Sequence, residues 1–216
     1  MTTATTLLGH ATAHRACTVC ADAGWITAAR PVFSGRPGQR ILLVGQAPGP
    51  VEADGGRPFA GRAGRELMRW LSRAGFRDEA DVRERVWMTS VTTCFPGRRA
   101  SGDGDRRPGS AEVRACAHWL DGVLTLLRPR LVMAVGTLAV SRLLPGSGGL
   151  EDVVGRRLAL PAAALPAHLE PPEAEVVALP HPSGQSRWLN DAAHRARLET
   201  ALLVIAEIVA RVESTA

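Results

Sequence analysis

The chain of 216 residues contains no lysine and no tyrosine, and only 4% of its residues are aromatic. Because lysine is absent, every strongly cationic side chain is an arginine, which can bind phosphate through two parallel N–H groups. The formal net charge of +5 therefore favours a nucleic-acid partner. A genome rich in G and C would also replace lysine by arginine. That alternative explains the type of cation but not the net excess of positive charge.

The sequence also lacks any long apolar run. No segment approaches the roughly 18 uninterrupted apolar residues of a membrane span, and residues 1–15 lack the basic-then-apolar pattern of a signal peptide. We therefore expect a cytoplasmic protein without membrane association. Hydrophobic residues make up 45% of the chain, which is enough for one core, and no repeats interrupt it. We expect residues 1–216 to form a single domain.

Four apolar runs alternate with helical patterns along the chain. The runs predict buried parallel strands at 41–44, 85–91, 131–136 and 175–179, and the helical patterns fall at 65–74, 110–127, 137–144 and 192–212. We interpret residues 145–172, rich in glycine, proline and alanine, as a surface segment. This alternation predicts a three-layer α/β/α fold with a short, four-stranded, mostly parallel sheet.

The segment 45–64 connects the first predicted strand to the first of these predicted helices and is rich in glycine and proline. Its glycine spacing is not that of a dinucleotide site, and no Gly-Lys-Ser/Thr follows as in a phosphate-binding loop. Ligands of open α/β sheets bind at the carboxyl ends of strands. Gln46, Ser90 and His181 each lie at or just after such an end, so we expect them to converge on one site.

Four cysteines could close a metal site. Cys17 and Cys20 form a C-x-x-C pair, and Cys94 and Cys116 lie far downstream. Four thiolates suit either tetrahedral zinc or a [4Fe–4S] cluster, and the spacing alone does not decide between them. Buried free cysteines that act as small hydrophobic residues are the structural alternative.

Three motifs carry a family resemblance. They are G-Q-A-P-G at 45–49, G-R-P-F-A-G-R-A-G at 56–64 and His-Pro-Ser at 181–183. Together they resemble the uracil-DNA glycosylase superfamily, and the iron–sulfur families four and five in particular. The resemblance extends over nearly the whole chain and supports the predicted fold class.

The resemblance also implies a cofactor. Families four and five place an N-terminal C-x-x-C, a cysteine after a strand and a cysteine near the start of a helix. The segments 89–94 and 112–116 fit the last two, so the resemblance assigns Cys17, Cys20, Cys94 and Cys116 to a [4Fe–4S] cluster. Such a cluster would be structural, pinning the N-terminal segment and a long loop onto the domain. The implied partner is DNA that contains a deaminated base, and we expect a monomer.

The same resemblance assigns roles in base excision. His181 would donate a hydrogen bond to the uracil O2 as negative charge develops on the leaving base. Gln46 would orient the base or the attacking water, and Phe59 would stack on the flipped base. Ala47 and Ser90 would complete the base pocket. The implied activity is that of a monofunctional glycosylase.

DNA contacts are expected in two places. Ser183 and Gly184 would hold a phosphate beside the flipped nucleotide, and Arg187, with Trp188 and Leu189, would enter the gap in the base stack. Arg98 and Arg99 belong to a glycine-rich basic loop at 95–110, which could track a DNA backbone. A solvated surface insertion is the alternative for that loop, since its two aspartates dilute the positive charge.

The chain departs from the family pattern at three site positions. Ala47 stands where another branch has a water-activating aspartate, Gln46 stands for the family-four carboxylate, and Ser90 stands for the asparagine that reads the uracil edge. The loop between the last two cysteines has no histidine, so covalent capture of the sugar is not expected. Two hypotheses stay open beside the excising enzyme: a DNA-binding relative of low activity and a zinc-bound structural domain.

Overall fold

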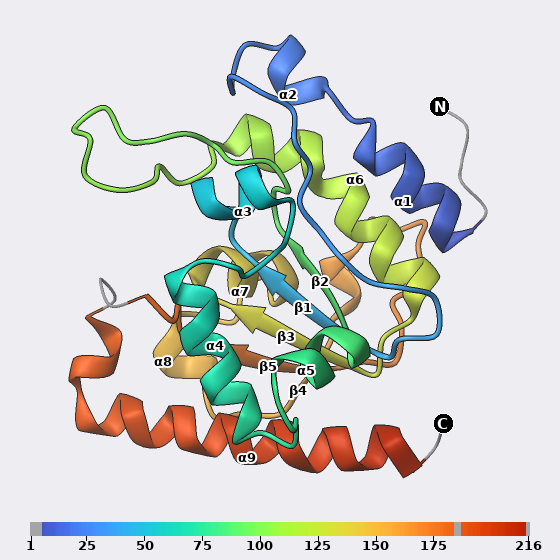
Figure 1. The fold of residues 1–216 in the computed structure, drawn as a ribbon. Helices are drawn as coiled ribbons and strands as arrows, with labels where there is room; N and C mark the ends of the chain where they lie inside the picture. Colours follow the sequence, from blue (N-terminus) through green and yellow to red (C-terminus); the bar gives the residue numbers. More distant parts are fainter. Residues whose placement is uncertain (1–5, 184–186, 215–216) are drawn as a thin grey trace.

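A twisted central sheet organises the molecule (Figure 1). The computed structural model describes residues 6–183 and 187–214, and within these ranges the sheet has five strands in the order β2-β1-β3-β5-β4. The strands are β1 (Ile41–Gly45), β2 (Val86–Ser90), β3 (Leu131–Val135), β4 (Leu158–Ala159) and β5 (Glu175–Leu179). All pairs are parallel except the antiparallel pair of β4 and β5. The expected α/β/α class is confirmed.

The sheet has one strand more than the sequence predicts. β4 is a two-residue edge strand inside the segment 145–172, which also holds α8 (Leu150–Val153) and the short η1 (Ala162–Ala164). Two residues are too few to produce a periodic pattern. The four predicted strands form where they are expected, because each consists mostly of residues that are buried on both faces of the sheet.

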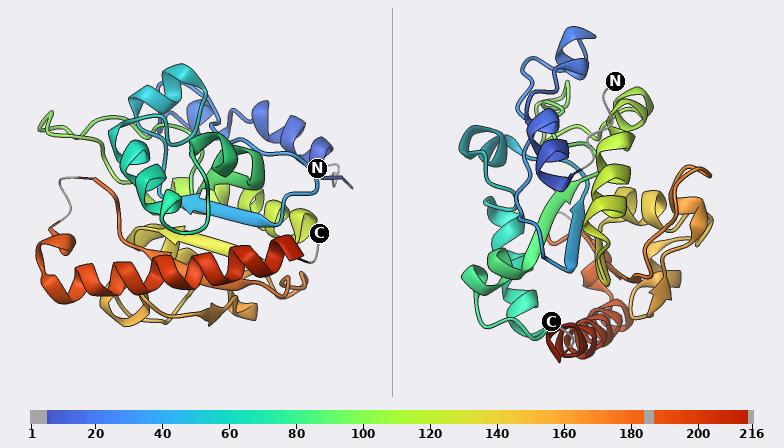
Figure 2. Two further views of the ribbon diagram at one scale, coloured as in Figure 1. Left: turned by 60° about the horizontal axis from the view of Figure 1, so that its bottom comes forward. Right: turned by 90° about the vertical axis from the view of Figure 1, so that its right-hand side faces the viewer.

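Helices cover both faces of the sheet (Figure 2). One layer holds α4 (Arg62–Ser72), α5 (Glu79–Arg85) and α9 (Ala192–Ser214), and an ion pair between Arg73 and Glu199 joins α4 to α9. The other layer holds α6 (Ser110–Leu127) and α7 (Thr137–Leu143), joined by Arg142 and Asp121. Among the described residues, no helix has the length and hydropathy of a membrane span.

The N-terminal segment packs on the outside of α6. It comprises α1 (Leu7–Arg15) and the single turn α2 (Val19–Asp22). His10 and His14 on α1 are buried, and the His10 Nε2 atom lies 2.9 Å from the Trp119 carbonyl oxygen of α6. The sequence did not reveal α1 as a packed helix, because two of its three buried residues are histidines.

The carboxyl ends of the parallel strands meet at one edge of the sheet, towards which their arrowheads point in Figure 1. Gly45 of β1 lies opposite Ser90 of β2, and Val135 of β3 lies opposite Leu179 of β5. The short helix α3 (Pro50–Gly55) follows β1 at this edge. The loops that carry the motifs therefore start next to one another.

Candidate functional site

A cleft of about 660 Å³ lies at the carboxyl edge of the sheet. Most of the predicted site residues line it, and they come from five segments that are distant in the sequence: Gln46, Ala47, Phe59, Ser90, Arg99, His181 and Ser183. The volume is in the range of ordinary small-ligand sites. Gln46, Ser90 and His181 therefore line one cleft, as the sequence analysis expects.

Phe59 forms one wall of the cleft, over the end of β1. A Cβ atom added to Gly45 would come within 2.9 Å of the Phe59 ring and 3.3 Å of the Ser90 hydroxyl oxygen. The backbone of Phe59 is left-handed, with φ of 54°, which is uncommon for an aromatic residue. A Cβ atom on Gly64 would lie 2.0 Å from the Phe59 carbonyl oxygen. Gly45 and Gly64 therefore leave the space that the position of Phe59 requires.

Glu52 fastens the loop that carries Phe59, a role that the sequence did not reveal. Its Oε2 accepts a hydrogen bond from the Gly49 N–H at 3.1 Å, and its Oε1 accepts one from the Gly61 N–H at 2.7 Å. One carboxylate thus ties together the two ends of the segment 49–61. The signal in the sequence was a capping box, with Pro50 at the start of α3 and Glu52 two residues later.

His181 stands across the cleft, against Gly136. Its Cδ2 would lie 3.5 Å from a Cβ atom at position 136, which is ordinary van der Waals contact. The Ser183 N–H donates to the His181 Nδ1 atom at 3.3 Å. The residue is open to the cleft, yet the walls around it desolvate the ring and lower its pKa. A neutral ring that accepts at Nδ1 carries its proton on Nε2.

Arg98 and Arg187, two predicted DNA contacts, are not among the described residues that line the cleft. Arg98 forms a β-bridge with Asp105, and their side chains are 3.9 Å apart, so this part of the loop 95–110 has a defined turn. Arg187 caps η2 (Trp188–Asn190), directly after residues 184–186. Gly184 lies outside the described residues.

The two apolar residues expected in the DNA stack have other contacts. Trp188 stacks on His194 with ring centroids 4.2 Å apart, and Leu189 packs against the hydrophobic core. Insertion into a base stack would require these contacts to break.

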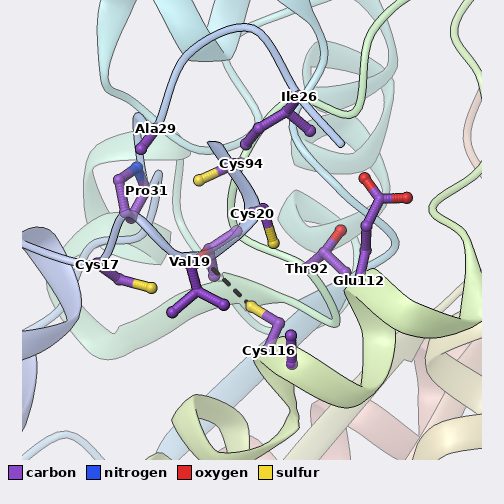
Figure 3. Close-up of a pocket in the computed structure, with 12 residues that line it drawn as sticks. Cys17, Val19, Cys20, Ile26, Ala29, Pro31, Thr92, Cys94, Glu112 and Cys116 are labelled. Carbon is purple, nitrogen blue, oxygen red and sulfur yellow. Dashed lines mark hydrogen bonds between the residues drawn. The ribbon is translucent and has the colours of Figure 1, made fainter. Parts of the chain in front are cut away.

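The four cysteines meet in a second pocket, next to the cleft. Figure 3 shows their sulfur atoms around one space, with Val19, Ile26 and Pro31 among the other lining residues. Cys17 and Cys20 come from the N-terminal segment, Cys94 follows β2, and Cys116 belongs to α6. The predicted convergence of the thiols is therefore observed, and none of the four is in a disulfide.

The pocket supplies a donor set of four thiols. In the part of the chain that the structure describes, no three His, Cys, Asp or Glu side chains are close enough to hold one metal ion. Four thiolates can hold either tetrahedral zinc or a [4Fe–4S] cluster. Burial raises the pKa of Cys20 to about 11 and that of Cys94 to about 12. Four thiolates in this pocket would thus need a positively charged group to offset their desolvation.

A buried histidine supports the cysteine pocket from behind. His14 is stacked between Phe33 and Trp119, with centroid distances of 4.5 and 4.4 Å. Its Nε2 lies 2.8 Å from the Thr93 hydroxyl oxygen, which is 3.7 Å from the Cys116 sulfur. Burial lowers the pKa of His14 to about 3. Sequence reasoning missed this contact, because its partners are 79 residues apart.

An ion pair separates the two pockets. Arg106, which lines the cleft, donates two hydrogen bonds of 2.7 Å to Glu112, which lines the cysteine pocket. It donates a third to the Trp25 carbonyl oxygen at 2.8 Å. Hydrogen bonding by Arg106 keeps the pKa of Glu112 below its usual value. Arg106 therefore braces the loop and is not available as a free cation for DNA.

The fold and the cleft define an α/β protein with a ligand site at the carboxyl edge of the sheet, lined by an aromatic side chain and a histidine. The model of the uracil-DNA glycosylase superfamily matches residues 33–203. The chain belongs to this superfamily.

Type-4 and Type-5 uracil-DNA glycosylases are among the curated relatives. The chain is 35% identical over 115 residues to a Type-4 uracil-DNA glycosylase of Pyrobaculum aerophilum, covering 53% of each chain. It is 35% identical over 115 residues to a Type-4 enzyme of Thermotoga maritima, covering 53% of this chain and 54% of the relative. It is 37% identical over 131 residues to a Type-5 uracil-DNA glycosylase of Thermus thermophilus, covering 56% of this chain and 57% of the relative. The chain thus spans about half the length of the curated relatives it matches.

Proposed function

We propose that the protein is a monofunctional DNA glycosylase that removes uracil or a related deaminated base by hydrolysis of the N-glycosidic bond. The observation that carries the proposal is that Phe59 and His181 line one cleft. Membership of the superfamily and the names of the Type-4 and Type-5 relatives support it. The acting unit would be the whole chain, residues 1–216, as a monomer on DNA.

His181 would stabilise the leaving base. When the bond between C1′ of the sugar and the base breaks, its electron pair stays with the base, which becomes an anion. The proton on Nε2, which follows from the Ser183 bond to Nδ1, would donate to the uracil O2. A preorganised donor of this type contributes about 3 kcal/mol to transition-state stabilisation. The lowered pKa of His181 keeps the ring in this neutral form at neutral pH.

The other walls would select and hold the extruded base. The Phe59 ring offers a stacking face, and its contact with Gly45 fixes it over the end of β1. Gln46 would orient the base or the attacking water. Ala47 and Ser90 would bound the base pocket, and a serine hydroxyl is shorter than an amide, so the base edge would be read less strictly than by an asparagine.

DNA would lie along the rim of the cleft. Ser183 and Gly184 would hold a phosphate next to the flipped nucleotide, while Arg98, Arg99 and Arg187 would contact the backbone. Arg99 is the member of this set that also lines the cleft. The contribution of such contacts depends on salt, because each releases counterions from DNA.

We assign the cysteine pocket to a [4Fe–4S] cluster bound by Cys17, Cys20, Cys94 and Cys116. The convergence of the four thiols and the names of the Type-4 and Type-5 relatives support this assignment. When bound, the cluster would act as a structural cross-link among the N-terminal segment, the segment after β2 and α6. The cleft and this pocket are connected by the pair of Arg106 and Glu112 and by two backbone hydrogen bonds, from the Val32 N–H to the Thr93 carbonyl oxygen and from the Thr92 N–H to the Gln46 carbonyl oxygen.

Single-turnover excision on oligonucleotides that carry uracil, hypoxanthine or xanthine tests the proposal. His181→Ala should slow cleavage about 100-fold or more with nearly unchanged DNA affinity, because its donor acts mainly as charge develops. Phe59→Ala should also weaken capture of the base, by roughly 1–3 kcal/mol of lost stacking. His168→Ala, an exposed histidine outside the cleft lining, serves as the matched control.

The alternative is a DNA-binding relative of low activity, which the neutral side chains at positions 46, 47 and 90 favour. It would bind DNA and excise none of the three bases. If the wild-type protein behaves in this way, or if His181→Ala cleaves as fast as wild type, the proposed mechanism is wrong.

A further inference from the structure

The proposed reaction needs a negative group near the sugar, and the motif positions do not supply one. As the glycosidic bond breaks, the sugar becomes an oxocarbenium-like cation, and water must lose a proton as it adds. Gln46 and Ala47, which follow β1, are both neutral. The carboxylate must come from another part of the cleft or be absent.

Two carboxylates line the cleft among the described residues, and they differ in what they already bind. Both oxygens of Glu52 accept backbone N–H groups, from Gly49 and from Gly61. Glu52 is thereby committed to holding the loop. The Asp105 carboxylate forms a long ion pair with the Arg98 guanidinium, with 3.9 Å between Oδ1 and Nη1, and the Asp105 side chain is 40% exposed.

The position of Asp105 is fixed by its backbone. Residues Arg98 and Asp105 form a β-bridge, and the Arg106 N–H donates to the Gly97 carbonyl oxygen at 3.0 Å. The next residue, Arg106, is held by Glu112. This brings Asp105 over the loop that carries Gln46, since its Oδ2 would lie 3.4 Å from a Cβ atom on Gly49.

We propose that Asp105 is a catalytic residue of the base-excision reaction, which places the carboxylate in the loop 95–110 instead of the segment after β1. In this reaction the C1′–N bond breaks with its electron pair on the base, and the base anion is stabilised by His181. The water oxygen forms a bond to C1′, and its proton passes to the Asp105 carboxylate and then to solvent. The negative charge of Asp105 also offsets the positive charge of the sugar. The inference rests on the proposed function.

The test compares Asp105→Asn with Asp103→Asn in single-turnover excision of uracil across a range of pH. Asp103 is an exposed carboxylate on the same loop, outside the cleft lining, so its variant removes the same charge from the same loop. Asp105→Asn should be about 100-fold slower, the usual contribution of a positioned base, whereas Asp103→Asn should match wild type. Asp105→Glu should recover part of the rate.

Two further readouts separate a catalytic from a structural role. Asp105→Asn keeps the backbone bridge, so the midpoint of denaturant unfolding should not change. Its affinity for undamaged DNA should be equal or higher, because a negative charge near the phosphates is gone. The rate of Asp105→Asn should also lose any dependence on an acidic group that the wild-type pH profile shows.

The outcomes distinguish this inference from the proposed function. If wild type excises the base and Asp105→Asn is equally fast, Asp105 is not catalytic, while the proposed function stands. An equal loss of rate in Asp103→Asn would likewise overturn the assignment, since it would indicate a general effect of loop charge. If wild type excises no base, the proposed function and this inference fail together.

Discussion

The helix position of Gly64 gives a sharp test of how Phe59 is held. Gly64 lies in the first turn of α4, and its φ is not in the left-handed region, so intrinsic propensity alone would favour alanine by about 1 kcal/mol. The structure reverses this expectation. The added Cβ would lie 2.0 Å from the Phe59 carbonyl oxygen and 2.3 Å from its carbonyl carbon. Both atoms belong to the backbone, so no side-chain rotation can relieve the overlap.

We therefore expect Gly64→Ala to lower the free energy of unfolding by about 1–3 kcal/mol, the usual cost of overpacking. It should also weaken base capture, because Phe59 has to move away from Gly45. The control is Gly55→Ala, at the end of α3, whose Cβ meets nothing within 4 Å. Denaturant unfolding and equilibrium binding to a uracil-containing oligonucleotide measure the two effects. If Gly64→Ala is as stable as Gly55→Ala and binds the base equally well, the argument about Phe59 is refuted.

Three other predictions concern the cysteine pocket, the rim and the buried histidine. Cys116→Ala should abolish the iron and acid-labile sulfide content of protein purified anaerobically. It should also lower the free energy of unfolding, because a closed metal site contributes folding free energy. A content of about one zinc and no iron in the wild-type protein would reject the cluster. Joint replacement of Arg98 and Arg99 by alanine should weaken binding to all DNA sequences and flatten the salt dependence of the affinity. Arg40→Ala, at the opposite edge of the sheet, should change the affinity less. Equal effects of the two changes would argue against a DNA contact by the loop 95–110. The pKa of His14 is about 3 in the folded state and near 6.5 in the unfolded chain, so the unfolded state binds more protons between these pKa values. The free energy of unfolding should therefore fall by about 2 kcal/mol from pH 7 to pH 5. Denaturant unfolding at pH 7 and pH 5 should show a smaller loss for His14→Phe than for wild type, and an equal loss would contradict this explanation.

The sheet and the cleft were largely predictable from the sequence because their signals are local. Three of the four predicted strands contain an aliphatic run of at least four residues, the strand at 85–91 is a mixed run of apolar and hydroxyl residues, and a glycine, serine or proline lies at or next to each strand end. The rule that ligands bind at the carboxyl ends of parallel strands then brought Gln46, Ser90 and His181 together without any knowledge of the structure. The cysteine set followed from the family resemblance, since spacing alone left zinc and an iron–sulfur cluster open.

The features that were not predicted depend on contacts between distant segments. His14 reaches Thr93 across 79 residues, and Arg106 is fixed by Glu112 and by Trp25. The sequence of the loop 95–110 is rich in glycine and charge, which predicts a basic surface loop but no particular turn. The turn of this loop is defined by the β-bridge between Arg98 and Asp105, and a single bridge produces no periodic pattern in the sequence.

The pair of Arg106 and Glu112 explains why a structural cofactor would matter for chemistry in a separate cleft. Glu112 belongs to the first turn of α6, where it also accepts the Gly109 N–H at 2.6 Å, and Cys116 follows one turn later. Arg106 joins this helix start to the Trp25 carbonyl oxygen, in the segment after Cys20. The proposed cluster would tie the same two segments together. Its loss would release both partners of Arg106, and with them the loop that carries Asp105 and Arg99 into the cleft. A defect in excision after loss of a cysteine would then arise from a displaced loop wall and not from any role of iron in breaking the bond.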